Sequence, residues 1–170
     1  MRPQRPQPPK GAREDVILFT VGGFRFAIAA GAVSEIRGLE GLRSFSLGSS
    51  YMRMPKVDFT LERNGTIYFV VDAARHFHLS RPVGSSPARL LVLRQSAAAI
   101  QVDSTDRMME ISVLHALPQA FTGDERHWYR GLVIVNGDVV PAVNQNAFLS
   151  KAEMAVLKTA VQRVRGAAAV

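Results

Sequence analysis

The sequence predicts a mainly β fold built from small barrels, with short helices and a C-terminal amphipathic helix. Two observations support this prediction. Short apolar segments are joined in pairs by tight turns, and irregular connections link the pairs, without the long crossover helices that a parallel sheet requires. A strong helix pattern occurs near the C-terminus. A chain of 170 residues suffices for one sizeable domain.

Four β-hairpins are predicted along the chain. Gly-Gly and Asn-Gly pairs between apolar runs are strong hairpin signals, because a two-residue turn needs positive φ angles that these residues tolerate. Such pairs interrupt three segments, at Gly22-Gly23, Asn64-Gly65 and Asn136-Gly137. The predicted hairpins span residues 16–28, 60–71 and 132–143, and a fourth spans 90–102 with its turn at 94–97.

Three helices complete the predicted elements. A short helix is expected over residues 30–36, and Asp72 is expected to cap another over 73–77. The last begins with the capping-box pair Ser150 and Glu153. Its apolar stripe, expected to pack on the barrels rather than to bind a partner, consists of Met154, Leu157, Val161 and Val164.

Composition and charge restrict the function classes. A hydrophobic content of 47% argues against a wholly disordered chain, and the absence of cysteine excludes disulfides and cysteine-based metal sites. The net charge of +7 lies in the two ends, with +4 in residues 1–13 and +3 in 151–165, so that 14–150 is neutral. Because a nucleic-acid-binding domain usually carries a basic stripe on the fold itself, this distribution argues against that class.

The sequence predicts a Pro- and Arg-rich disordered leader over residues 1–14, one domain over 15–165 and a frayed tail over 166–170. No segment approaches the roughly 20 apolar residues of a membrane-spanning helix.

No catalytic, metal-binding or cofactor-binding constellation is predicted, and the chain is not expected to be an enzyme. His76 and His78 are expected to be partly exposed surface side chains rather than metal ligands. Asp103 and Asp106 are expected to lie in a solvated, ion-paired turn.

Two aromatic residues stand in a polar connection before the last hairpin. Trp128 and Tyr129 can fold back onto the core or contact a partner, and packing is the expected use.

An ordered series of segments resembles the CheW-like chemotaxis coupling proteins. The opening hairpin and the following Val33–Gly38 segment are similar to the first strands of that family and its Val-x-Glu motif. Residues 64–77 are similar to its segment ending in Val/Ile-x-Asp-Leu-Arg, and 99–111 to its Val-Asp signature. Its last hairpin and closing helix resemble residues 129–149 and 150–157, so that the similarity spans about 15–165.

This resemblance implies two small five-stranded β-barrels packed together as subdomains. It also implies a cytoplasmic, non-enzymatic adaptor that is recruited to the membrane-associated receptor array. The implied partners are the regulatory domain of a CheA-type histidine kinase and the cytoplasmic tip of chemoreceptors. One alternative is an adaptor of a pilus-motility or other chemosensory pathway with altered partners. A small barrel that binds nucleic acid is an alternative of another class.

The partner-binding residues that the resemblance implies lie in two segments. The first contains Val33, Glu35, Ile36 and Arg37, of which Glu35 is the foremost interface candidate, while Val33 or Ile36 is expected to pack in the barrel. The second contains Arg63 and Asn64.

The sequence departs from the family pattern around this second segment. Asn64 stands where the family has arginine before glycine, and Arg63 comes one position earlier, a shift that reverses the face of a strand. Phe69 replaces a proline, Ala73-Ala74 follows Asp72 in place of Leu-Arg, and the connection 41–57 is longer than usual.

Overall fold

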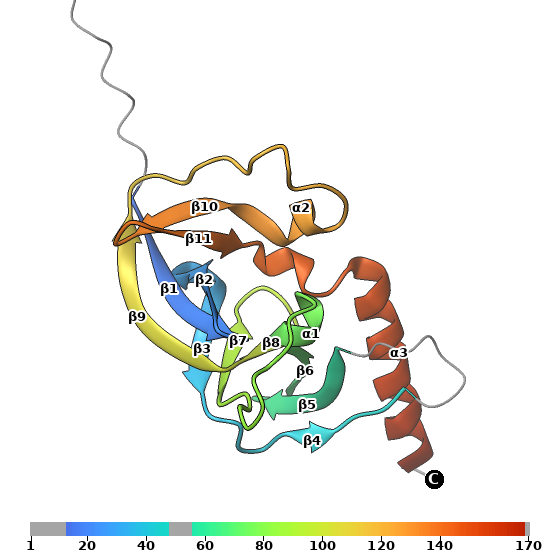
Figure 1. The fold of residues 1–170 in the computed structure, drawn as a ribbon. Coiled ribbons are helices and arrows are strands. Elements are labelled where there is room, and N and C mark those ends of the chain that lie inside the picture. The colour runs from blue at the N-terminus through green and yellow to red at the C-terminus, as the bar shows by residue number, and fades with distance from the viewer. Residues whose placement is uncertain (1–12, 48–55, 169–170) are drawn as a thin grey trace, which may run out of the picture.

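The computed structural model describes residues 13–47 and 56–168, which form two curved β-sheets flanked by a C-terminal helix (Figure 1). Sheet A has the order β10-β11-β2-β1-β9 and sheet B the order β3-β7-β8-β6-β5-β4. The strands of sheet A are β1 (Glu14–Val21), β2 (Phe24–Ala29), β9 (Ser104–Ile111), β10 (Tyr129–Val135) and β11 (Asp138–Val143). Those of sheet B are β3 (Val33–Arg37), β4 (Arg43–Ser44), β5 (Val57–Arg63), β6 (Thr66–Asp72), β7 (Arg89–Leu93) and β8 (Ala98–Val102).

The predicted mainly β fold is confirmed, and the two predicted barrels correspond to these two sheets. Sheet B exceeds the expected five strands by the two-residue β4. The chain leaves sheet A after β2, builds sheet B, and returns to sheet A at β9. Sheet B is therefore inserted within the sequence of sheet A.

All four predicted hairpins form with antiparallel register. In two of their turns an asparagine takes a positive φ of 50°, at Asn64 and Asn136, and each is followed by a glycine at positive φ. One parallel pairing then joins two hairpins within each sheet, β2 with β11 in sheet A and β6 with β8 in sheet B.

The helix predicted over 30–36 is wrong. Only Ala30–Ala32 forms a short 3-10 turn, and Val33–Arg37 continues as strand β3. The reason is tertiary, because β7 offers a buried edge to which β3 pairs from Val33 opposite Leu93 to Arg37 opposite Leu90. Pairing with that edge also suits the β-branched Val33 and Ile36.

Most inner strands bury side chains on both faces. In β1, Val16 and Leu18 enter a core inside sheet A, whereas Ile17, Phe19 and Val21 enter a central core between the sheets. The strands β6, β7 and β8 divide their side chains in the same way between the central core and a third core inside sheet B. This double burial explains why these strands read as continuous apolar runs rather than alternating ones.

The short helix α1 (Ala73–His76) begins as predicted, because the Asp72 carboxylate accepts a hydrogen bond of 3.0 Å from the Ala74 N–H. Two further short helices, α2 (Glu125–Trp128) and the 3-10 turn Gln145–Ala147, flank the last hairpin.

The C-terminal helix α3 (Lys151–Ala168) has the predicted capping box. The Glu153 N–H donates to Ser150 Oγ at 3.1 Å, and the Ser150 N–H donates to Glu153 Oε2 at 2.7 Å. Leu157 is fully buried, whereas Val164 is 64% exposed, so that only part of the apolar stripe packs. The helix extends to Ala168, past the start of the tail predicted at Gly166.

The predicted leader lies outside the described residues apart from Arg13 and Glu14, and β1 already begins at Glu14. Part of the long connection 41–57 also lies outside them.

The different burial of two positions on α3 gives a test of its packing. We expect Leu157→Ala to lower the free energy of unfolding by about 2–5 kcal/mol, because it opens a cavity in the central core. The matched change Val164→Ala should cost less than about 0.5 kcal/mol. Urea denaturation of both variants measures the difference, and equal losses would contradict the packing described for α3.

Candidate partner-binding surface

Glu35 and Arg63, both singled out from the sequence, form an ion pair. The Arg63 guanidinium donates two hydrogen bonds to the Glu35 carboxylate, of 3.2 Å from Nε and 3.0 Å from Nη2. The two residues lie on β3 and at the end of β5, which are not neighbours in sheet B. The Glu35 side chain is 34% exposed and that of Arg63 is 42% exposed, so that a partner can reach both.

Two further predicted residues lie on the same strand as Glu35. Arg37 donates from Nη2 to the Glu40 carbonyl at 2.8 Å and lies 4.0 Å from the Glu35 carboxylate. Its Nε atom is buried and has no hydrogen-bond partner in the described part of the chain. Ile36 exposes 45% of its surface, and because it pairs with Leu91 of the central core, it points to the other face of β3 from Glu35 and Arg37.

The remaining two predicted residues have other environments. Val33 is 7% exposed and belongs to the central core, so that of the pair Val33 and Ile36 it is Val33 that packs. Asn64 is exposed in the turn of the β5–β6 hairpin, where its positive φ suits asparagine. We call the set Glu35, Ile36, Arg37, Arg63 and Asn64 the Glu35 surface.

A second charge cluster, which the sequence did not predict, joins the two sheets. The Arg81 guanidinium donates to both Asp72 oxygens at 3.0 Å and from Nε to Asp103 Oδ1 at 2.9 Å. The other Asp103 oxygen accepts the Gly22 N–H of the β1–β2 turn at 2.7 Å. Only the folded structure shows this cluster, because its residues come from distant segments and Arg81 lies in a polar loop that has no recognisable sequence motif.

The solvated turn predicted for Asp103 and Asp106 is therefore half wrong. The Asp103 side chain is 16% exposed and bound from two sides, because the end of β8 meets both Arg81 and the turn of sheet A. Asp106 is exposed and pairs with Arg25 at 3.5 Å, as expected, but it lies within strand β9 rather than in a turn.

The expectation of a partly exposed His76 is also wrong, since α1 turns its side chain into the central core and leaves it 6% exposed. Burial, helped by the neighbouring Lys56 ammonium, lowers the pKa of His76 to about 4, although the Glu153 carboxylate acts in the opposite direction. Lys56 Nζ lies 3.5 Å from His76 Nδ1 and 3.2 Å from Glu153, which connects α1 with the start of α3. His78 is exposed, as predicted.

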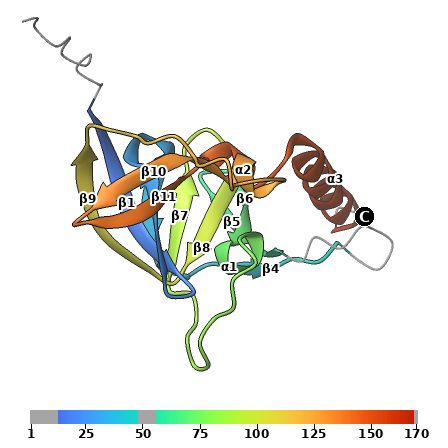
Figure 2. The ribbon, with the colours of Figure 1, turned by 45° about the horizontal axis from the view of Figure 1, so that its top comes forward.

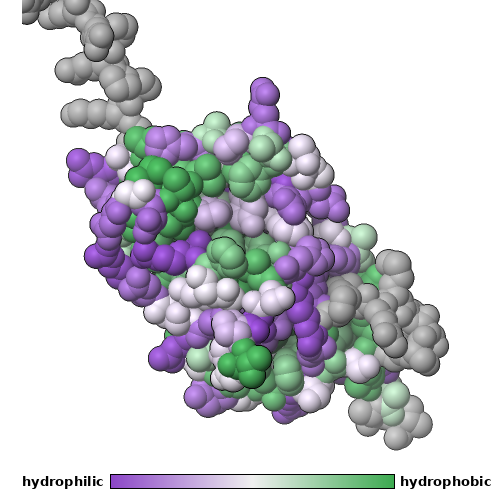
Figure 3. Space-filling view, viewed as in Figure 1, coloured by the Kyte–Doolittle hydropathy of each residue, from purple (hydrophilic) through white to green (hydrophobic). Residues whose placement is uncertain are grey.

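The aromatic residues of the last connection pack as expected. Trp128 and Tyr129 are partly buried against the central core. Burial and the nearby Glu125 carboxylate raise the pKa of Tyr129 to about 12. Figure 3 shows apolar side chains gathered over the β10–β11 hairpin, where Ile134 and Val139 face each other across the strands and are both exposed.

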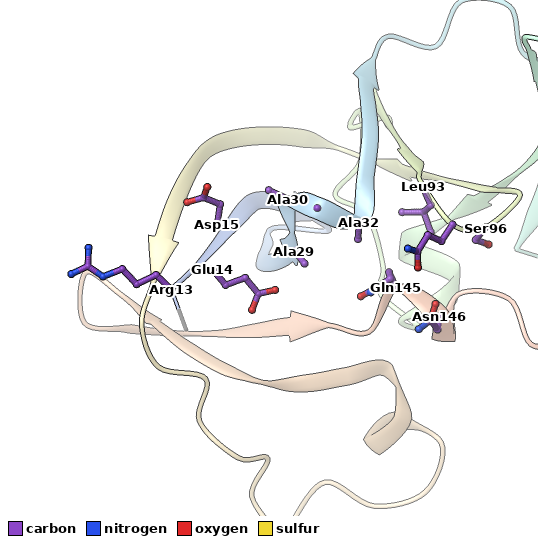
Figure 4. A pocket seen from close by; sticks show the side chains of 12 residues that line it. Arg13, Glu14, Asp15, Ala29, Ala30, Ala32, Leu93, Ser96, Gln145 and Asn146 are labelled. Atoms are coloured by element: carbon purple, nitrogen blue, oxygen red, sulfur yellow. The ribbon is translucent and has the colours of Figure 1, made fainter. Parts of the chain in front are cut away.

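A hollow of about 480 Å³ lies beside the start of β1 and the turn before β3. Figure 4 shows Glu14 and Gln145 projecting into it from opposite sides, and the short segment 29–32 lines it with small residues. Arg130 binds the Glu14 carboxylate at 2.8 and 3.0 Å and thereby lowers its pKa. Gln145 Oε1 is buried and has no partner among the residues described.

Within residues 13–47 and 56–168, no three histidine, aspartate or glutamate side chains come together in a way that could hold a metal ion. No helix in this part of the chain is long and apolar enough to span a membrane.

The fold defines a class of protein, namely a mainly β domain of two packed sheets with a closing helix. The chain belongs to the CheW-like domain family, whose family model matches residues 15–153. Among solved structures it is similar to the scaffolding protein TtCheW from Thermoanaerobacter tengcongensis, with 13% sequence identity and a TM-score of 0.67. That match covers 88% of this chain and 93% of the other. No curated protein matches the chain.

The lowered pKa of His76 predicts a pH-dependent stability. Because the unfolded chain binds a proton near pH 6.5 and the folded chain only near 4, the unfolded state gains protons first as the pH falls. The free energy of unfolding therefore has its full value above pH 6.5 as far as His76 is concerned. It falls by up to about 3 kcal/mol between pH 6.5 and pH 4, because protonation of His76 favours the unfolded chain.

Denaturation between pH 7 and 4 measures this slope, and His76→Gln should flatten it. The matched variant His78→Gln changes an exposed histidine and should keep the slope of the unaltered chain. An unchanged slope in His76→Gln would show that His76 does not titrate as described.

Proposed function

We propose that this chain is a non-enzymatic adaptor of chemotaxis-type signal transduction, which couples chemoreceptors to a CheA-type histidine kinase. The observation that supports it most is the family match over residues 15–153, together with a fold shared with a CheW scaffolding protein. The partners are the regulatory domain of the kinase and the cytoplasmic tip of the receptors. The adaptor then works in the cytoplasm, at the receptor array.

The Glu35 surface is the proposed receptor-binding site. It offers a partly exposed ion pair, and Ile36 adds an exposed apolar side chain on the other face of the same edge strand. Apolar and charged groups are commonly mixed in protein interfaces. The ion pair holds the Glu35 carboxylate in one orientation while leaving it accessible to donors on a partner. Electrostatic complementarity of this kind contributes specificity more than raw affinity.

The first experiment measures binding by calorimetry to the kinase regulatory domain and to a receptor-tip fragment from the same cell. Both are expected to bind in the micromolar range. Binding of the kinase domain alone would favour an adaptor with altered partners, as in a pilus-motility pathway. Binding of neither would overturn the proposed function, and steeply salt-dependent binding to oligonucleotides would revive the nucleic-acid alternative.

Charge reversal at Glu35 tests the receptor-binding site. Glu35→Arg should weaken binding of the receptor fragment at least about tenfold, because it repels Arg63 and removes the acceptor that the partner meets. The matched control is Glu62→Arg, which changes an exposed acid one position before Arg63 on the same strand. That control should bind the fragment like the unaltered chain.

The double variant Glu35→Arg with Arg63→Glu distinguishes direct contact of Glu35 with the receptor from a purely structural role of the ion pair. It restores an ion pair with the charges exchanged. If the receptor meets the Glu35 carboxylate itself, binding stays weak, as we expect. Full recovery would show that the ion pair only supports the fold.

A further inference from the structure

The hollow beside the start of β1 lies where the two sheets meet the segment that leads to α3, which Figure 2 shows at the side of the sheets. Its walls come from β1 of sheet A, the segment 29–32 that links β2 with β3, the β7–β8 turn of sheet B and the 3-10 turn Gln145–Ala147. Its volume of about 480 Å³ falls within the roughly 300–1,000 Å³ that is typical of small-molecule sites. The hollow can therefore hold a small organic molecule in contact with both sheets.

The hollow stays open because one of its walls consists of small residues, namely Ala29, Ala30, Gly31 and Ala32. Gly31 does not have a positive φ, so that other residues can adopt its backbone conformation. A Cβ atom placed on Gly31 would meet no atom of the described residues within 4 Å, apart from those of its chain neighbours. A larger side chain therefore has room at this position, where it would narrow the hollow.

Glu14 brings a negative charge into the hollow. Figure 4 shows its carboxylate pointing inward, whereas the side chains of Arg13 and Asp15 point away. The hydrogen bonds from Arg130 lower the pKa of Glu14, so that its carboxylate is ionised at neutral pH. Each carboxylate oxygen has a second lone pair and can accept from one more donor.

Gln145 offers a hydrogen-bond acceptor on the facing wall. Its Oε1 atom is buried and has no donor among the described residues. A buried acceptor that lacks a donor raises the free energy of the folded chain, and a ligand that donates to it removes this cost. The acceptor therefore favours a ligand with N–H donors, and the charge of Glu14 favours a cationic one.

We propose that this hollow binds a small aliphatic amine, whose ammonium group donates hydrogen bonds to the Glu14 carboxylate and to Gln145 Oε1. The net charge of the chain is +7, which does not attract cations in general, so that binding depends on these local groups. The inference is independent of the proposed function, because binding of the amine requires neither the kinase nor the receptor.

The test measures binding by calorimetry with 1,4-diaminobutane as the probe. The dissociation constant should be below about 1 mM, and the uncharged 1,4-butanediol, which has the same carbon chain, should bind at least about tenfold more weakly. Gly31→Leu should weaken binding of the diamine at least about tenfold, because the leucine side chain occupies the hollow. Gln145→Met keeps the length of the side chain but removes the acceptor, and it should weaken binding about tenfold.

The matched control is Gly166→Leu on the exposed end of α3, where an added Cβ atom likewise finds open space. This variant should bind the diamine like the unaltered chain. Without ligand, Gly31→Leu and Gln145→Met should melt close to the temperature of the unaltered chain, because neither change removes a contact of the fold. A loss of binding then does not come from unfolding.

A saturating amount of the diamine should raise the melting temperature of the unaltered chain but not that of Gly31→Leu. No binding of the diamine to the unaltered chain at about 10 mM would overturn the proposed site. Equal binding of the diol, or an equal loss in Gly166→Leu, would also overturn it. These outcomes leave the adaptor role untouched, since the kinase domain and the receptor fragment test that role separately.

Discussion

The burial of both faces of the inner strands is the constraint on which the rest of this structure depends. Phe26 of sheet A stacks on Phe77, which follows α1, with ring centroids 4.7 Å apart, and Leu157 of α3 enters the same core. Each sheet therefore contributes side chains both to its own core and to the central core between the two sheets. A change in the central core affects both sheets and the closing helix together.

The charged clusters are placed at the borders of this apolar framework. Glu35 and Arg63 link two strands of sheet B that do not pair, where a backbone ladder is absent. Asp103 links the two sheets, because it binds Arg81 on one side and the Gly22 N–H on the other. The first pair is open to a partner, whereas the second is largely enclosed. Replacing one member of the second cluster by a neutral residue leaves an enclosed charge without its partner. This lowers the free energy of unfolding more than the loss of an exposed ion pair does.

The sequence predicted those elements whose signals are local. The Asn-Gly and Gly-Gly turns, the Asp72 cap and the Ser150–Glu153 capping box all act within a few residues, and all are present. Errors arose where distant segments decide. Residues 33–37 became a strand because β7 pairs with them, and His76 is buried because Trp128 and Phe148 surround it. Glu35 and Arg63 belong to two separate segments that the family resemblance implies. Only the fold shows that their side chains form an ion pair.

The insertion of sheet B within sheet A has a consequence for synthesis and folding. All strands of sheet B are present once Val102 has been made, whereas sheet A lacks β9, β10 and β11 until Val143. During synthesis, sheet B can therefore form while β1 and β2 still lack their partner strands β9 and β11 and expose apolar side chains. These strands need protection until the last hairpin arrives, because chains with exposed strand edges associate readily. Contacts across more than a hundred positions, such as Glu14 with Arg130, then complete folding last and slow it.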